Sequence, residues 1–120
     1  MRGLFASFKY AIAGIWRAFK QERNLKIHAL AILAVVALGL CLDIERLEWL
    51  VLLLTIALVV GLELLNTAVE ALVDLVTEEY RHFAAIAKNV AAGAVLFCAF
   101  VAVIIGLIIF IPYLSNVFNK

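Results

Sequence analysis

The stretch WLVLLLTIALVVGLELLNTAVEALVDL, residues 49–75, is almost wholly apolar at its start and carries acidic side chains toward its end. No charged residue precedes Glu63 within it, whereas Glu63, Glu70 and Asp74 lie in its second half. About 20 apolar residues are enough for a helix to cross a hydrocarbon core that is about 30 Å thick. The sequence therefore predicts a membrane-spanning helix over 49–75 whose last turns bear carboxylates.

The polar residues of this helix share one side. At about 100° per residue, Asn66, Thr67, Glu70 and Asp74 lie within about 60° of Glu63 around the helix axis. A rise of about 1.5 Å per residue puts Glu63 about 21 Å along the span, still inside the hydrocarbon core. An ionisable side chain at that depth is costly and indicates a function. The alternative is a structural role, as a protonated or hydrogen-bonded glutamate between helices.

Two further apolar runs, residues 27–42 and 88–118, predict two more membrane helices. In all, 68% of the 120 residues are hydrophobic, compared with about half in a typical soluble domain. Residues 4–20 place apolar and aromatic side chains on one helical face and basic ones such as Lys9 and Arg17 on the other. This pattern is typical of a helix in the membrane interface, although a core-facing helix has it too. We expect one all-α integral-membrane domain, with an N-terminal amphipathic surface helix and three transmembrane helices.

The basic residues predict how the chain is oriented in the membrane. Most of the ten Lys and Arg residues precede the first long apolar run. The first predicted loop holds only Arg46, whereas the second holds Arg81 and Lys88. Because Lys and Arg are enriched in cytoplasmic loops, we expect the N-terminus and the second loop to be cytoplasmic. The first loop and the C-terminus are then expected outside.

The acidic side of the 49–75 helix suggests phosphoryl transfer from ATP to a lipid alcohol. Glu63 could take a proton from a lipid hydroxyl at membrane depth. Glu70, near the water edge, could bind Mg²⁺ together with phosphate oxygens. Lys88 could neutralise phosphate charge. Glu22 could supply a second carboxylate to the metal, although a solvated surface role fits it equally well.

Motifs of several other functional classes are absent. The sequence has no Walker A motif, no kinase-type Gly-rich loop, no HExxH and no GxSxG. His28 and His82 are isolated and do not indicate a metal site. Cys41 and Cys98 lie in apolar runs without CxxC spacing, as packed hydrophobic residues do. The basic N-terminal face lacks a nucleic-acid-binding module, so anionic lipid is its expected partner.

Four stretches resemble the bacterial diacylglycerol kinase family, which consists of small integral-membrane kinases unrelated to soluble kinases. They are ELLNTAVEALVDL (63–75), AKNVAAGAVL (87–96), FKYAIAGI (8–15) and ERNLKIH (22–28). The Glu-x-x-Asn-[Ser/Thr]-Ala-x-Glu core of the first is the most specific. The ERNLKIH stretch is more similar to the branch that phosphorylates undecaprenol than to the branch that prefers diacylglycerol.

The resemblance implies a homotrimer in the bacterial cell membrane, with active sites shared between protomers at the cytoplasmic side. Each protomer would have one surface helix and three transmembrane helices. The implied reaction is phosphorylation of undecaprenol or a diacylglycerol by ATP with Mg²⁺. A rival hypothesis is a non-catalytic membrane oligomer, such as a pore or a proton-coupled transporter. A transporter needs acids along a path across the whole membrane, whereas the runs 27–42 and 90–118 contain no charged residue.

The resemblance also implies roles for individual residues. Glu63 corresponds to the catalytic base, and Glu22 and Glu70 correspond to metal-binding carboxylates. The implied ATP-binding positions are Tyr10, Glu22, Asn66, Glu70, Glu79, Tyr80, Lys88 and Asn89. The implied lipid-binding positions are Glu63, Asn24, His28, Trp49 and Ala92. Two departures affect the adenine end of the site more than the catalytic end: the family usually has Asp in place of Asn89, and RHFAAIAKN (81–89) lacks the Pro and one Lys that are common in the family's loop.

Overall fold

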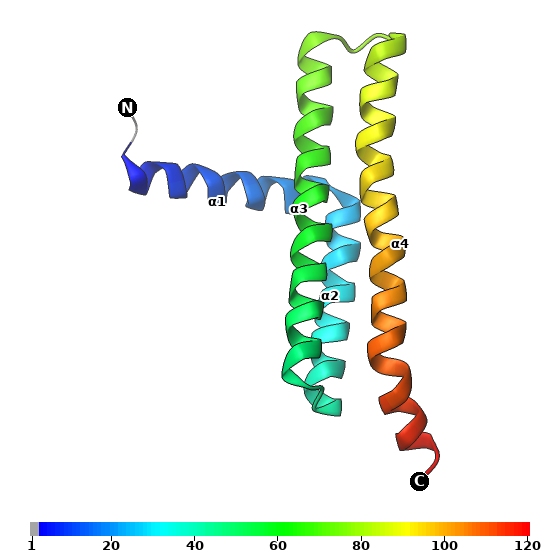
Figure 1. Cartoon of the computed structure of the whole chain (residues 1–120). Coiled ribbons are helices and arrows are strands. Elements are labelled where there is room, and N and C mark those ends of the chain that lie inside the picture. Colours follow the sequence, from blue (N-terminus) through cyan, green and yellow to red (C-terminus); the bar gives the residue numbers. More distant parts are fainter. Residues whose placement is uncertain (1–2) are drawn as a thin grey trace.

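The computed structural model describes residues 3–120 and consists of four helices: α1 (Leu4–Gln21), α2 (Arg23–Leu42), α3 (Arg46–Val76) and α4 (His82–Phe118). The helices α2, α3 and α4 share one long axis, and α1 leaves this bundle at a steep angle (Figure 1). By length and composition, α2, α3 and α4 are each able to cross a membrane. The prediction of an all-helical chain with three long apolar helices is confirmed.

The membrane helices begin earlier than the apolar runs do. α2 starts at Arg23 rather than at 27, α3 at Arg46 rather than at 49, and α4 at His82 rather than at 88. Hydropathy reports which residues prefer the hydrocarbon core, whereas backbone hydrogen bonding continues into polar flanking turns. The polar turns at the helix starts are therefore helical although they do not belong to the apolar spans.

Two tight corners connect the first three helices. Between α1 and α2 only Glu22 has extended backbone dihedrals, with φ −94° and ψ 116°, and the buried side chains of Ala18 and Leu25 lie on either side of it. Between α2 and α3, Asp43 adopts the left-handed conformation with φ 51°, which Asp tolerates better than most residues. Glu45 and Glu48 then form a reciprocal capping box that starts α3.

The apolar core lies at the end of the bundle where α2 meets α3. Buried Ile44 and Leu52 pack there with Ile109 and Phe110 of α4. Beside this core the Tyr113 hydroxyl on α4 donates a hydrogen bond of 2.6 Å to a carboxylate oxygen of Glu48 on α3, so that one polar contact ties the two longest helices together.

Most large apolar side chains outside this core are exposed. Leu33 on α2, Leu54 on α3 and Phe97 on α4 have 67%, 72% and 72% of their surface accessible. Soluble monomers rarely expose contiguous apolar surfaces on this scale. The outer faces of the bundle therefore require lipid or other protein chains around them.

The close approach of α2 to α3 depends on a glycine. A methyl group added at Gly39 would lie 2.9 Å from Cη2 of Trp49 and 3.2 Å from Cδ1 of Ile44. We expect Gly39→Ala to lower the free energy of unfolding by about 1–3 kcal/mol, because the indole ring must shift in a packed corner. Titration with an unfolding detergent, followed by circular dichroism, measures this change.

Gly106→Ala is the matched control, because nothing lies within 4 Å of a Cβ at Gly106 on α4. This control should be neutral or should gain up to about 1 kcal/mol from helix propensity. If the two variants unfold alike, the packing of Trp49 against Gly39 does not determine the stability of the corner.

Candidate active site

Glu63 lies in the middle of α3, with only 3% of its surface exposed. Within residues 3–120 it is the one charged residue that the fold buries. Its Oε1 lies 3.3 Å from Nε2 of His28 on α2. About one turn further along α3, Thr67 donates its hydroxyl to the backbone carbonyl of Glu63. The structure therefore places a desolvated carboxylate beside an imidazole inside the helix bundle.

Asn66 lies about one turn beyond Glu63 and offers a buried acceptor. In the described part of the chain its Oδ1 is buried and has no hydrogen-bond partner. Buried polar side-chain atoms in complete assemblies nearly always have a partner. Asn66 is therefore ready to accept a hydrogen bond from a substrate or from a neighbouring copy of the chain.

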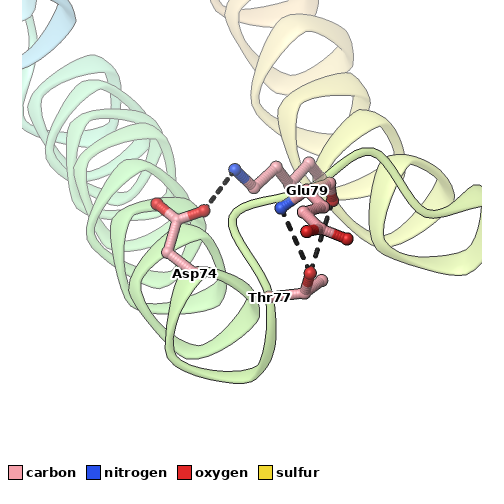
Figure 2. A network of polar contacts seen from close by, with 4 residues as sticks. Asp74, Thr77 and Glu79 are labelled. Atoms are coloured by element: carbon pink, nitrogen blue, oxygen red, sulfur yellow. Dashed lines mark hydrogen bonds and ion pairs between the residues drawn. The ribbon is translucent and has the colours of Figure 1, made fainter.

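An ion pair joins α3 to α4 near the connecting loop. Nζ of Lys88 lies 2.6 Å from Oδ1 of Asp74, and both side chains are partly exposed (Figure 2). In the loop itself, the Glu79 backbone N–H donates a hydrogen bond of 3.1 Å to Oγ1 of Thr77, which fixes the first turn after α3. The ammonium group of Lys88, which the sequence suggests for neutralising phosphate charge, is thus held beside the loop that connects α3 and α4.

A cavity of about 360 Å³ opens between this loop and the start of α4. Its size lies within the range of about 300–1,000 Å³ that small-molecule sites occupy. Four of the residues assigned to ATP on resemblance line it: Glu79, Tyr80, Lys88 and Asn89. Val73, Thr77, Glu78, Arg81, Ala84 and Ala85 complete the lining. Four of the eight implied ATP-binding residues therefore lie around one cavity.

The other sequence-assigned residues do not line this cavity. Glu70 is half-buried on α3, between the levels of Glu63 and Asp74, and Glu22 is half-buried at the corner of α1 and α2. Asn24 is exposed in the first turn of α2, Ala92 is exposed on α4, and Tyr10 is exposed on α1.

Trp49 lies at the opposite end of α3 from the cavity. It packs against the core around Ile44 and Leu52 and lies over Gly39. Along the helix it is about 21 Å from Glu63. The structure therefore gives Trp49 a packing role at the α2–α3 corner and does not bring it together with the residues around Glu63.

The donor set for a metal consists of carboxylates from separate elements. No group of three or more His, Cys, Asp or Glu side chains in residues 3–120 is arranged to hold an ion. Mg²⁺ commonly uses one or two protein carboxylates and completes its coordination with phosphate oxygens and water. A Mg²⁺ ion held by one or two carboxylates of this chain would therefore need phosphate oxygens or water to complete its coordination.

Asp74 is the residue whose role the sequence did not reveal. It belongs to the acidic side of α3, but no function was assigned to it. Asp74 follows Glu70 by four residues, so both lie on one face of the helix. This spacing is the sequence feature that could have indicated a role for Asp74. Its pairing with Lys88 depends on how α3 and α4 align across the loop, which hydropathy does not determine.

Comparisons with known proteins identify the family of this chain. The family model described as Prokaryotic diacylglycerol kinase matches residues 9–110. The protein named Undecaprenol kinase in Bacillus subtilis (strain 168) is 44% identical over 110 residues, covering 92% of this chain and 89% of that protein. The Diacylglycerol kinase of Synechocystis sp. is 47% identical over 114 residues, covering 94% of this chain and 65% of that protein.

A more distant relative is the Diacylglycerol kinase of Escherichia coli (strain K12), which is 33% identical over 95 residues and covers 79% of this chain and 78% of that protein. The matched region, residues 9–110, runs from α1 into α4 and includes Glu63, Asp74, Lys88 and the residues that line the loop cavity. This chain belongs to the prokaryotic diacylglycerol kinase family.

Proposed function

We propose that this chain is an integral-membrane lipid kinase that transfers the γ-phosphoryl group of ATP to the hydroxyl of a membrane lipid alcohol. The observation that carries the proposal is the buried Glu63 carboxylate on a membrane helix that leads directly to the loop cavity. Val73 of α3 lines that cavity and lies about 15 Å along the helix from Glu63. A nucleotide whose base occupies the cavity would extend its phosphates past Glu70 toward Glu63.

In this reaction Glu63 acts as the base. Its carboxylate accepts the proton of the lipid hydroxyl while the lipid oxygen attacks the γ-phosphorus, and ADP leaves with the electron pair of the broken P–O bond. Because only 3% of the surface of Glu63 is exposed, water has little access to it, and hydrolysis of ATP is disfavoured there. Asn66 would accept a hydrogen bond from the lipid or the nucleotide.

The phosphate charge is balanced by a cation and a metal ion. Lys88 would exchange its contact with Asp74 for a phosphate oxygen when the nucleotide binds. Glu70 and Glu22 would hold Mg²⁺, which neutralises charge on the transferring phosphate when it is bound. Asp74 keeps the ammonium group at the cavity when no nucleotide is present.

The assembly is part of the proposal. We infer one membrane-embedded domain over residues 1–120, in the bacterial cell membrane, with the α3–α4 loop cytoplasmic and the C-terminus outside. α1 would lie in the membrane interface, an arrangement supported by its steep angle to the bundle (Figure 1) and by Lys20, whose Nζ lies 5.3 Å from the centre of the Trp16 ring. The exposed apolar faces of α2, α3 and α4 support a homotrimer in which the protomers share active sites.

The lipid is expected to be undecaprenol. The support is the ERNLKIH stretch (22–28), which ends at His28 beside Glu63. Purified protein in mixed micelles, given labelled ATP and equal amounts of undecaprenol and a diacylglycerol, should label undecaprenol preferentially. A preference for the diacylglycerol would reverse the choice of lipid and leave the kinase reaction in place.

Glu63→Gln tests the kinase reaction at its base. The amide keeps the shape of the side chain but cannot accept the proton, so we expect kcat to fall roughly 10²–10⁴-fold while Mg·ATP binding remains. Phosphoryl transfer to lipid and calorimetric titration with Mg·ATP measure the two quantities. Glu48→Gln, at the far end of α3, is the control and should retain activity. Turnover by Glu63→Gln within about tenfold of the wild-type rate would contradict the assignment.

Glu70→Ala tests the metal site. Removing this carboxylate should weaken Mg²⁺-dependent ATP binding by about tenfold or more, or about 1.4 kcal/mol, because the ion loses a protein ligand. Titration with ATP at several Mg²⁺ concentrations measures the change. An ATP affinity that responds to Mg²⁺ as the wild type does would remove Glu70 from the metal site.

A further inference from the structure

The burial of Glu63 raises the question of where its proton goes after each turnover. With 3% of its surface exposed, the carboxyl group has almost no contact with water. A base that keeps its proton cannot accept another, so each catalytic cycle requires a route by which the proton leaves. The groups next to Glu63 therefore determine whether its ionised form can be regenerated.

His28 is the titratable side chain in contact with Glu63. Its Nε2 lies 3.3 Å from Oε1 of the carboxylate, and its own side chain is 22% exposed. The imidazole thus has one nitrogen against the buried acid, and it lies at the start of the apolar run 27–42, where we expect the membrane surface. A group that meets both environments is suited to carry a proton between them.

We propose that His28 takes the catalytic proton from Glu63 and releases it to water at the membrane surface. This inference rests on the proposed kinase reaction and adds a step to it. His28 acts through Glu63, a role different from the lipid contact implied by resemblance.

Each proton in this step can be followed from donor to acceptor. Glu63 becomes a neutral acid when it accepts the lipid hydroxyl proton, as the new P–O bond forms and the bond to ADP breaks. The acid proton then passes to the lone pair of Nε2 on a neutral His28. The imidazolium ring then turns about its Cβ–Cγ bond, releases the Nε2 proton to water and turns back. This restores a neutral His28 with its proton on Nδ1 and the lone pair on Nε2, and Glu63 is again ionised.

Few other titratable groups lie on the helices packed against this pair. The contacts Asp74–Lys88 and Glu48–Tyr113 set the register of α3 against α4 and put Cys98 about level with Glu63. α4 has no Asp, Glu, Lys, Arg or His between Asn89 and Asn119. The remaining charged groups on these elements include Arg17 and Lys20 at the end of α1, Glu22 at the α1–α2 corner, Arg23 and Lys26 on α2, and Glu70 about two turns further along α3.

The relay predicts a specific dependence of kcat on pH. Imidazoles in proteins change charge between about pH 5 and pH 8. Only a neutral imidazole can accept the proton from Glu63, so a relay through His28 predicts that kcat rises with pH. The first measurement is kcat of the wild-type protein at saturating Mg·ATP and lipid from pH 5 to pH 8. A flat profile would overturn the relay without any variant.

The second measurement uses His28→Ala. We expect its kcat to fall by about tenfold or more, with KM for Mg·ATP unchanged, and we expect added imidazole to restore kcat in a concentration-dependent manner. His82→Ala, which removes the exposed histidine at the start of α4, is the matched control and should behave as the wild type with or without imidazole. His28→Gln, a polar replacement that cannot relay protons, should lose kcat and the pH dependence together.

The outcomes separate the relay from the kinase reaction. Absence of lipid phosphorylation by the wild type would refute the proposed function itself. If the wild type turns over and His28→Ala is fully active, the relay is overturned and the kinase reaction stands. The same holds if the activity lost in His28→Ala is not restored by imidazole and His28→Gln retains the pH profile of the wild type. Size-exclusion chromatography and Mg·ATP binding identify a misfolded variant, in which case the wild-type pH profile decides.

Discussion

The burial of one carboxylate in an apolar bundle is the constraint on which the rest of this structure depends. Removing an ionised group from water is costly unless it has a partner. α2 places the imidazole of His28 against Glu63, so the corner at Glu22 that directs α2 along α3 also sets which side chain the buried acid meets. The fold and the proposed chemistry therefore share the same contact.

The two halves of α3 have different roles, one in stability and the other in the proposed chemistry. Its first half packs Leu52 into the core with Ile109 and Phe110, and the Glu48–Tyr113 hydrogen bond ties it to α4. Its second half carries the acidic and amide side chains and ends near the ion pair of Asp74 with Lys88, which lines the loop cavity. A rigid helix suits this division, because the depth of each polar group is fixed by its position along the axis.

The sequence predicted what depends on local periodicity and composition. It predicted the three long helices and the shared side of Glu63, Asn66, Glu70 and Asp74, because a period of 3.6 residues determines both. It did not predict which helix turns lie next to one another, since that depends on corner geometry and packing between helices.

Particular contacts illustrate this limit. The contact of His28 with Glu63, the ion pair of Asp74 with Lys88 and the packing of Trp49 against Gly39 each join different helices, so no pattern along one helix predicts them. The helices also extend beyond the apolar runs, because polar flanking turns are helical without being hydrophobic.

The partition of the γ-phosphoryl group between lipid and water tests the central claim most directly. A dry site at Glu63 should deliver phosphate to the lipid hydroxyl and not to water. With γ-labelled ATP and purified protein in lipid-containing micelles, the account predicts that label appears in the lipid phosphate and that release of inorganic phosphate stays at background. Release of inorganic phosphate at a rate equal to or above lipid labelling, or a rate independent of added lipid alcohol, would contradict it.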